Sequence, residues 1–160
     1  MPQIEQSVTI NRPISEVFRF AADFENKAQQ WQPDIIQHYQ TEDKVRVGVM
    51  ITQSRSTRLL GWRLDLNADI TGYQPNKLIE YKGVLGRFPV LGRLEFSGTG
   101  GSTTVTESMD IRLGCLFAPF SPLMTMVMTS RTRRVLERLK QLLESRSPGS
   151  QAPTDFHQEL

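Results

Sequence analysis

The sequence predicts an α+β fold in which a curved, seven-stranded antiparallel sheet wraps around a long C-terminal helix, with two short helices between the first and second strands. Residues 35–113 alternate apolar and polar side chains in runs separated by turn residues, a pattern typical of antiparallel strands, here six of them. Residues 119–144 change to apolar spacings of three, four and eight, which predict one amphipathic helix. Because a twisted sheet cannot bury one face alone, we expect this helix to cover its concave side.

Shorter patterns predict the N-terminal elements. Ile4, Val8 and Ile10 alternate with polar residues and indicate a half-buried strand. The segment RPISEVFRFAADF then changes to helical spacing, and its Pro13 suits the first turn of a helix. A second short helix follows in FENKAQQW, where Asp23 can act as the N-terminal cap.

The six later strands are separated by turn signals near residues 42–43, 60–61, 74–76, 87–89 and 98–102. The clearest strand, LLGWRLDLNADIT, places apolar residues on one face and polar residues on the other. The glycine-rich turn GTGGS does not match a phosphate-binding loop, because Thr103 stands where G-x-G-x-x-G requires glycine and no lysine follows. We therefore expect a hairpin tip with glycine at positive φ.

Composition limits the classes of function. The chain has 160 residues, enough for one domain, and its formal net charge of +2 is too small for the broad cationic face that nucleic acid requires. Its single cysteine and two histidines give no metal-ligand spacing, and we expect neither a metal nor a cofactor. The segment MPQIEQSV shows no secretory signal, which favours the cytoplasm. We expect one domain over residues 1–145 and a disordered tail over 146–160.

Several segments carry a family resemblance: INRPISEVFRFAADFENKAQQW, VRVGVMITQSR, ITGYQPNKLIEYKG, GGSTTVTESMDI and PLMTMVMTSRTRRVLERLKQLLES. Together they cover about residues 3–145. In this order they resemble the polyketide cyclase/dehydrase and lipid-transport families of the START-like (SRPBCC) superfamily, whose helix-grip fold is shared with the birch-pollen allergen. One departure is Arg12, where a capping side chain is more favourable, and we expect it to cost local stability at most. The superfamily spans enzymes, carriers, chaperone activators and sensors, so the resemblance predicts the fold and leaves the function open.

The resemblance implies a hydrophobic cavity between the curved sheet and the C-terminal helix. The alternation of the strands and the spacing of the helix independently predict its lining, as ligand sites are mostly apolar with a few polar groups. The predicted ligand-binding residues are Trp62, Leu64, Leu66, Tyr81, Leu94, Phe96, Val105 and Met109 from strands, and Phe120, Met124, Val127 and Met128 from the helix. Methionines adapt to irregular ligands, although such a stripe is also typical of a plain core, and Met126 can point elsewhere.

Glu107 is the sharpest candidate for a polar site residue. It shares the apolar phase of its strand with Val105 and Met109, and a buried acid must be paired, neutral or next to water. Arg55 is in phase with inward positions of its own strand and is a candidate partner. Glu107 is therefore a candidate for polar ligand contacts or for general acid/base catalysis. Tyr81, in phase with Ile79 on its own strand, is a second candidate, and plain core packing is the alternative for it. Two alternatives remain: a bulge that turns Glu107 outward, and an ion pair with Arg55 that is purely structural.

Other residues carry weaker signals. His38 is expected on an exposed strand, although its titration range also suits a base or a sensor. Cys115 stands among apolar residues without a base nearby and is expected to be an inert, buried thiol. Basic residues near the C-terminal end of the long helix suit the helix dipole or, alternatively, anionic lipid headgroups; they are Arg131, Arg133, Arg134, Arg138 and Lys140.

These observations support three hypotheses of function. The preferred one is a non-catalytic binder or carrier of a small hydrophobic molecule such as a lipid, isoprenoid or polyketide-like compound, oriented by Arg55, Tyr81 and Glu107. The second is a cyclase, aromatase or dehydratase in which Glu107 acts as acid or base and Arg55 stabilises an oxyanion. The third is a module that docks transiently on a membrane or a partner through the apolar residues 116–124. The sequence predicts neither the ligand's identity nor the oligomeric state.

Overall fold

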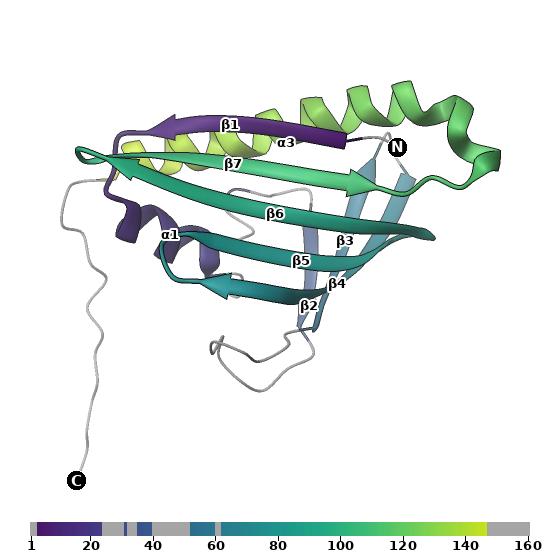
Figure 1. Ribbon diagram of the computed structural model, residues 1–160, viewed down its shortest axis with the longest axis horizontal. Helices are drawn as coiled ribbons and strands as arrows, with labels where there is room; N and C mark the ends of the chain where they lie inside the picture. The colour runs from purple at the N-terminus through teal and green to yellow at the C-terminus, as the bar shows by residue number, and fades with distance from the viewer. Residues whose placement is uncertain (1–2, 24–30, 32–34, 40–51, 60–61, 147–160) are drawn as a thin grey trace, which may run out of the picture.

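The computed structural model describes residues 3–23, 31, 35–39, 52–59 and 62–146 (Figure 1). In the strand segments 35–39, 52–59 and 62–67 the backbone alone is described. The elements, in chain order, are β1 (Gln3–Ile10), α1 (Ile14–Ala22), β2 (Ile35–Tyr39), β3 (Thr52–Leu59), β4 (Trp62–Gln74), β5 (Leu78–Leu85), β6 (Phe88–Thr99), β7 (Ser102–Ile111), the 3₁₀ helix η1 (Cys115–Phe120) and α3 (Ser121–Glu144).

The strands form one sheet of seven in the order β1-β7-β6-β5-β4-β3-β2, and every neighbouring pair is antiparallel. β1, β7, β6 and β5 lie side by side, whereas β2 and β3 cross them steeply, so the sheet is strongly bent (Figure 1). The helix α3 runs along β1, and α1 packs against β6 and β7. The predicted α+β architecture of an antiparallel sheet with a long C-terminal helix is confirmed.

Turn positions agree with the sequence wherever the backbone is described. Turns lie at residues 75–77, 86–87 and 100–101, and those expected at 42–43 and 60–61 fall outside the described residues. At the tip of GTGGS, Gly100 has φ 59° and Gly101 has φ 87°, values that a two-residue hairpin turn requires and that glycine adopts without strain. The glycine-rich stretch is therefore a hairpin tip, as predicted.

The C-terminal helix changes its type near its start. The helix expected from residue 119 begins as η1 and becomes α-helical at Ser121, with a proline in its first turn. The second short helix before Pro33 and the tail after Arg146 fall outside the described residues, so both stay predictions.

Among the described residues, all buried apolar side chains except that of Ala68 form two clusters. The α1-side cluster contains Val8, Ile10, Val17, Phe18, Phe20, Ala21, Trp31, Ile70, Ile79, Leu94, Phe96, Val105, Val135, Leu136, Leu139 and Leu143. The η1-side cluster contains Ile4, Leu85, Val90, Met109, Ile111 and Met128, with Tyr81, Phe88, Leu113, Met124 and Val127 packed against it. β1, β7 and α3 each contribute residues to both clusters, so these elements run from one cluster to the other.

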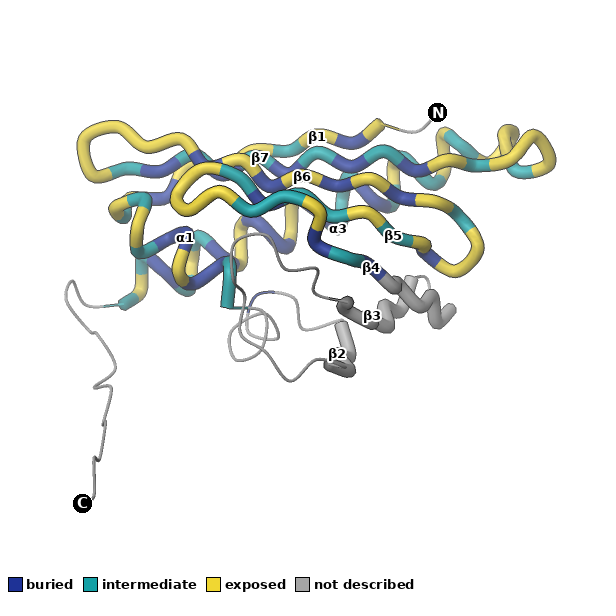
Figure 2. The backbone as a smooth tube through the Cα atoms, turned by 60° about the horizontal axis from the view of Figure 1, so that its bottom comes forward, coloured by how far each residue is buried: buried dark blue, intermediate teal, exposed yellow. Residues whose placement is uncertain are grey.

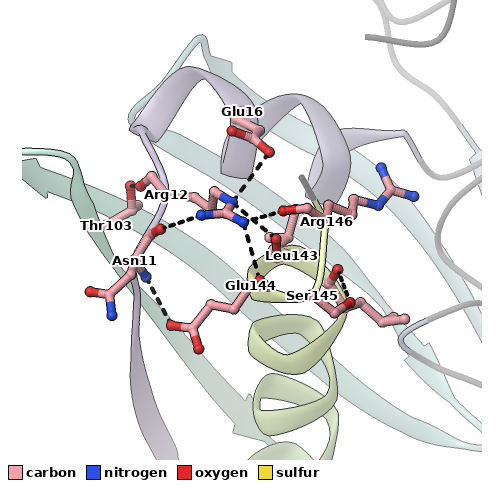
Figure 3. A network of polar contacts seen from close by, with 9 residues as sticks. Asn11, Arg12, Glu16, Thr103, Leu143, Glu144, Ser145 and Arg146 are labelled. Carbon is pink, nitrogen blue, oxygen red and sulfur yellow. Dashed lines mark hydrogen bonds and ion pairs between the residues drawn. The ribbon is translucent and has the colours of Figure 1, made fainter. Parts of the chain in front are cut away.

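Arg12 joins the start of α1 to the end of α3 (Figure 3). Its guanidinium donates hydrogen bonds to the carbonyl oxygens of Leu143 and Glu144, each at 3.1 Å, and to that of Arg146. It also lies 3.7 Å from a carboxylate oxygen of Glu16. The last carbonyls of a helix lack partners within the helix, and a cation near them is favourable. Arg12, which looked only like a poor cap for α1, therefore caps α3.

Candidate functional site

β7 presents Glu107 to the interior of the protein. Buried and partly exposed residues alternate along the strand, and the alternation continues on its neighbour β6 (Figure 2). Glu107 is 7% exposed and lies on the same face as the buried Val105 and Met109. Among the described residues, the buried polar side chains are Thr103, Glu107 and Thr132. Thr103 has a structural explanation, because its hydroxyl donates a hydrogen bond of 2.8 Å to the carbonyl oxygen of Arg12.

Tyr81 reaches Glu107 across the strand between them. Tyr81 on β5 pairs with Gly92 on β6, and the Tyr81 hydroxyl donates to Oε1 of Glu107 on β7 over 3.4 Å. A Cβ atom at Gly92 would lie 1.9 Å from Cζ of the Tyr81 ring and 2.3 Å from its hydroxyl oxygen. The ring therefore occupies the space that any other residue at position 92 would fill. Glycine at this position is what brings the phenol and the carboxyl group together.

The hydrogen bond between Tyr81 and Glu107 is long. O–H···O hydrogen bonds in proteins are usually about 2.7–2.8 Å between the oxygens, and the bond weakens with distance. A carboxylate has about four lone-pair positions that accept hydrogen bonds, and a phenol both donates and accepts. The Tyr81–Glu107 pair thus combines groups that can both contact one further polar atom.

Two more polar residues lie in the inward phase of their own elements. Gln6 on β1 pairs directly with Glu107 and is half-buried, in phase with Ile4 and Val8. Directly paired residues point to the same face of a sheet, so Gln6 and Glu107 are neighbours. Thr132 on α3 is 0% exposed, and its Oγ1 has no hydrogen-bond partner among the described residues.

These four residues, Gln6, Tyr81, Glu107 and Thr132, are called the polar band below. On β7, Glu107 lies between a residue of the α1-side cluster and one of the η1-side cluster. On α3, Thr132 lies four residues after Met128 of the η1-side cluster and four before Leu136 of the α1-side cluster. Gln6 occupies the corresponding place on β1. The band therefore marks the boundary between the two apolar clusters.

Sequence reasoning missed Gln6 and Thr132. Both signals were present, because Gln6 is in the inward phase of IEQSVTI and Thr132 is within the apolar stripe of the helix. Neither residue type alone suggests a site, since a glutamine within a strand and a threonine within a helix are common on surfaces.

Apart from Glu107 and Phe120, the predicted lining residues divide into three groups. Leu94, Phe96, Val105, Met109 and Met128 are buried in the two clusters. Tyr81, Met124 and Val127 are partly exposed and pack against the η1-side cluster. For Arg55, Trp62, Leu64 and Leu66 the backbone alone is described, on β3 and β4, so an Arg55–Glu107 contact stays a prediction.

Two expectations are wrong. Phe120 is 59% exposed, because it ends η1 before α3 turns toward the sheet, and so its side chain does not line the interior. Cys115 is exposed and not buried, because the chain leaves the sheet after β7 and η1 begins at this residue. The side chain of His38 lies outside the described part of the chain.

Comparison with protein families identifies the class of protein. Residues 1–144 match the family described as polyketide cyclase / dehydrase and lipid transport. The chain therefore belongs to this family. Among curated proteins, none matches this sequence.

Solved structures show the same fold at low sequence identity. The protein TTHA0849 from Thermus thermophilus has a TM-score of 0.75 at 16% identity, over 91% of this chain and 100% of its own. The Zhui aromatase/cyclase from Streptomyces sp. R1128 has a TM-score of 0.72 at 13% identity, over 92% of this chain and 97% of its own. Ara h 8.0201 has a TM-score of 0.70 at 12% identity, over 90% and 98%. Within the described residues, no helix combines the length and the apolar character needed to cross a membrane.

Proposed function

We propose that the protein binds a small hydrophobic molecule that carries a polar group, with the apolar part against the η1-side cluster and the polar group at Tyr81 and Glu107. The observation that carries this proposal is the contact between the partly exposed Tyr81 phenol and the buried Glu107 carboxyl group, where two apolar clusters meet. Burying a carboxyl group is costly, and a core that served stability alone would have an apolar residue at this position. Ligand sites combine apolar walls with a few placed polar groups in this way.

The residues around the pair suit a molecule with a hydroxyl or carbonyl group. Glu107 can accept a hydrogen bond from a ligand hydroxyl, and Tyr81 can donate one to a ligand oxygen. The flexible Met109, Met124 and Met128 at the η1-side cluster adapt to irregular apolar shapes. We expect Arg55, Trp62, Leu64 and Leu66 to complete the lining from β3 and β4. A lipid, an isoprenoid or a polyketide-like compound meets these requirements, and the cytoplasm stays the predicted location.

A second candidate function is polyketide cyclisation, aromatisation or dehydration. A phenol in hydrogen-bond contact with a carboxyl group can move a proton to or from a substrate, with Glu107 as base and Tyr81 as donor. The names of two structural neighbours, the Zhui aromatase/cyclase and the di-domain ARO/CYC BexL, motivate this candidate. In that case Glu107→Gln should retain binding of a polyketide-like substrate and lose its turnover.

Native mass spectrometry of the full chain purified from its own host tests the binding proposal directly. The expected result is an added mass that organic solvent releases as a small hydrophobic molecule. A probe pair then tests the role of Glu107: 2-naphthol carries a donor hydroxyl, and 2-methoxynaphthalene does not. We expect tighter binding of 2-naphthol by about tenfold, since one hydrogen bond contributes about 1–1.5 kcal/mol.

The variant Glu107→Leu, which has no acceptor, should remove most of this difference, and the control Glu137→Leu, at an exposed position of α3, should keep it. Absence of both a co-purified molecule and any probe binding would refute the proposal. Equal binding of the two probes by the unmodified protein would refute the role of Glu107 alone.

A further inference from the structure

One end of the molecule exposes large apolar side chains on adjoining elements. Leu116 on η1 is 87% exposed and Phe120 is 59% exposed, followed on α3 by Leu123 at 50% and Met126 at 61%. These four residues are called the apolar lip. η1 and the first turns of α3 project beyond the sheet, at the end opposite α1 (Figure 1). Folded proteins rarely expose such a group without an interaction to serve.

Along the sequence, the charged residues of the segment that carries the lip have one sign. The sequence from Ile111 to Leu136 contains no aspartate or glutamate. Arg112, just before η1, is exposed, and so are Arg133 and Arg134 on α3. Apolar residues next to basic ones are the combination that binds the surface of an anionic bilayer, where each cation contributes about 1 kcal/mol.

The spacing of these residues along α3 fits the depth of a membrane interface. Met126 and Arg133 are seven residues apart, which places them on the same side of the helix and separates them by about 10 Å along its axis. Apolar side chains of interfacial segments enter about 5–10 Å into the boundary between headgroups and acyl chains. When the lip occupies that depth, Arg133 is at the level of the lipid phosphates.

We propose that the apolar lip inserts into the surface of a bilayer that contains anionic phospholipids, with Arg112, Arg133 and Arg134 contacting the headgroups. The lip is a projection and not a groove, so a flat, deformable surface suits it better than a protein that must match its shape. The same segment turns Met124 and Val127 toward the η1-side cluster, so docking places that cluster next to the bilayer. Exchange of a ligand with the membrane rests on the proposed ligand-binding function as well as on docking. Docking itself does not depend on that function.

Flotation of the full chain with lipid vesicles tests the proposal. Vesicles of phosphatidylcholine alone are compared with vesicles that contain about 30% phosphatidylglycerol, at low salt and at about 0.5 M NaCl. We expect flotation with the anionic vesicles, little with the neutral ones, and a marked loss at high salt. Arg133→Gln/Arg134→Gln should reduce both the binding and its dependence on salt.

The decisive variant is Leu116→Ser/Phe120→Ser, for which we expect at least a tenfold loss of vesicle binding. Both side chains are exposed, so the fold should persist, which circular dichroism checks. The matched control is Val84→Ser/Leu91→Ser, which removes two apolar side chains, 41% and 42% exposed, from the outer face of the sheet and should leave binding unchanged.

Three results would overturn the proposal. The first is no flotation of the unmodified protein with anionic vesicles. The second is equal loss of binding in the lip variant and the control. The third is a dimer in light scattering that the lip variant converts to a monomer, which would assign the lip to an interface between two copies. A failed search for a co-purified ligand leaves the vesicle result unaffected, so the two proposals fail separately.

Discussion

Gly92→Ala is the most direct test of the Tyr81–Glu107 geometry. The new Cβ would lie 1.9 Å from the Tyr81 ring, so the ring must move and its hydrogen bond to Glu107 must break. Overpacking destabilises the fold by about 1–3 kcal/mol and the lost hydrogen bond by about 1 kcal/mol. In the opposite direction, alanine makes the unfolded chain less flexible than glycine does, which stabilises the fold by about 0.4–1 kcal/mol. The net expectation is a destabilisation of about 2 kcal/mol. For a domain of this size, that lowers the Tm by about 4–8 °C.

Thermal and urea denaturation, followed by circular dichroism, measure this loss. Gly114→Ala is the matched control, because no atom lies within 4 Å of the added Cβ and Gly114 has φ −64°, which alanine adopts freely. A double-mutant cycle isolates the clash: in a Tyr81→Ala background, Gly92→Ala should be nearly neutral. A loss of equal size in both backgrounds, or no loss in the original protein, would refute the reasoning.

Three further predictions concern Arg12, Thr132 and Tyr73. Arg12→Ala should destabilise the protein by about 2 kcal/mol in urea denaturation, because the last carbonyls of α3 lose their donor. Arg12→Lys should restore only part of this stability. An unchanged urea midpoint in Arg12→Ala would contradict the role of Arg12 as a cap. Thr132→Val should raise the free energy of unfolding by about 1 kcal/mol, because Oγ1 of Thr132 has no partner among the described residues. A lower free energy of unfolding in this variant would contradict the prediction and show that the hydroxyl makes a stabilising hydrogen bond. Burial raises the pKa of the Tyr73 phenol above 10.0, so the folded state favours the neutral form, and this contribution is complete below about pH 10 and is lost as the pH rises through the folded pKa. Tyr73→Phe should therefore weaken the fall in stability above about pH 10, and an unaltered pH profile would count against it.

Local patterns predicted the fold well where the structure describes it. Alternation along STTVTESMDI assigned the inward face of β7, and that face is the buried one. The turn GTGGS followed from glycine chemistry, and Gly100 and Gly101 both have positive φ. These features are local, because the side-chain period of a strand and the φ of a turn depend on residues close in sequence.

The candidate site was predictable only in part. The apolar phase singled out Glu107 and placed Tyr81 on the same face of the sheet, but it did not show that the two side chains meet. Their contact depends on the strand register that sets Gly92 opposite Tyr81, and on the fact that glycine has no side chain to block the Tyr81 ring. Cys115 was assigned wrongly because an apolar neighbourhood in sequence does not reveal where the chain leaves the sheet.

The sequence by itself determined which face of each strand is apolar, where the hairpins turn and which segment forms the long helix, since each depends on neighbours within a few residues. The tertiary structure decided which distant residues meet. It placed Gln6 beside Glu107, Thr132 at the boundary between the two clusters, and Arg12 at the carbonyl end of α3. Strand register and helix packing are long-range properties, because they minimise the free energy of the whole core and leave no periodic signal in one segment.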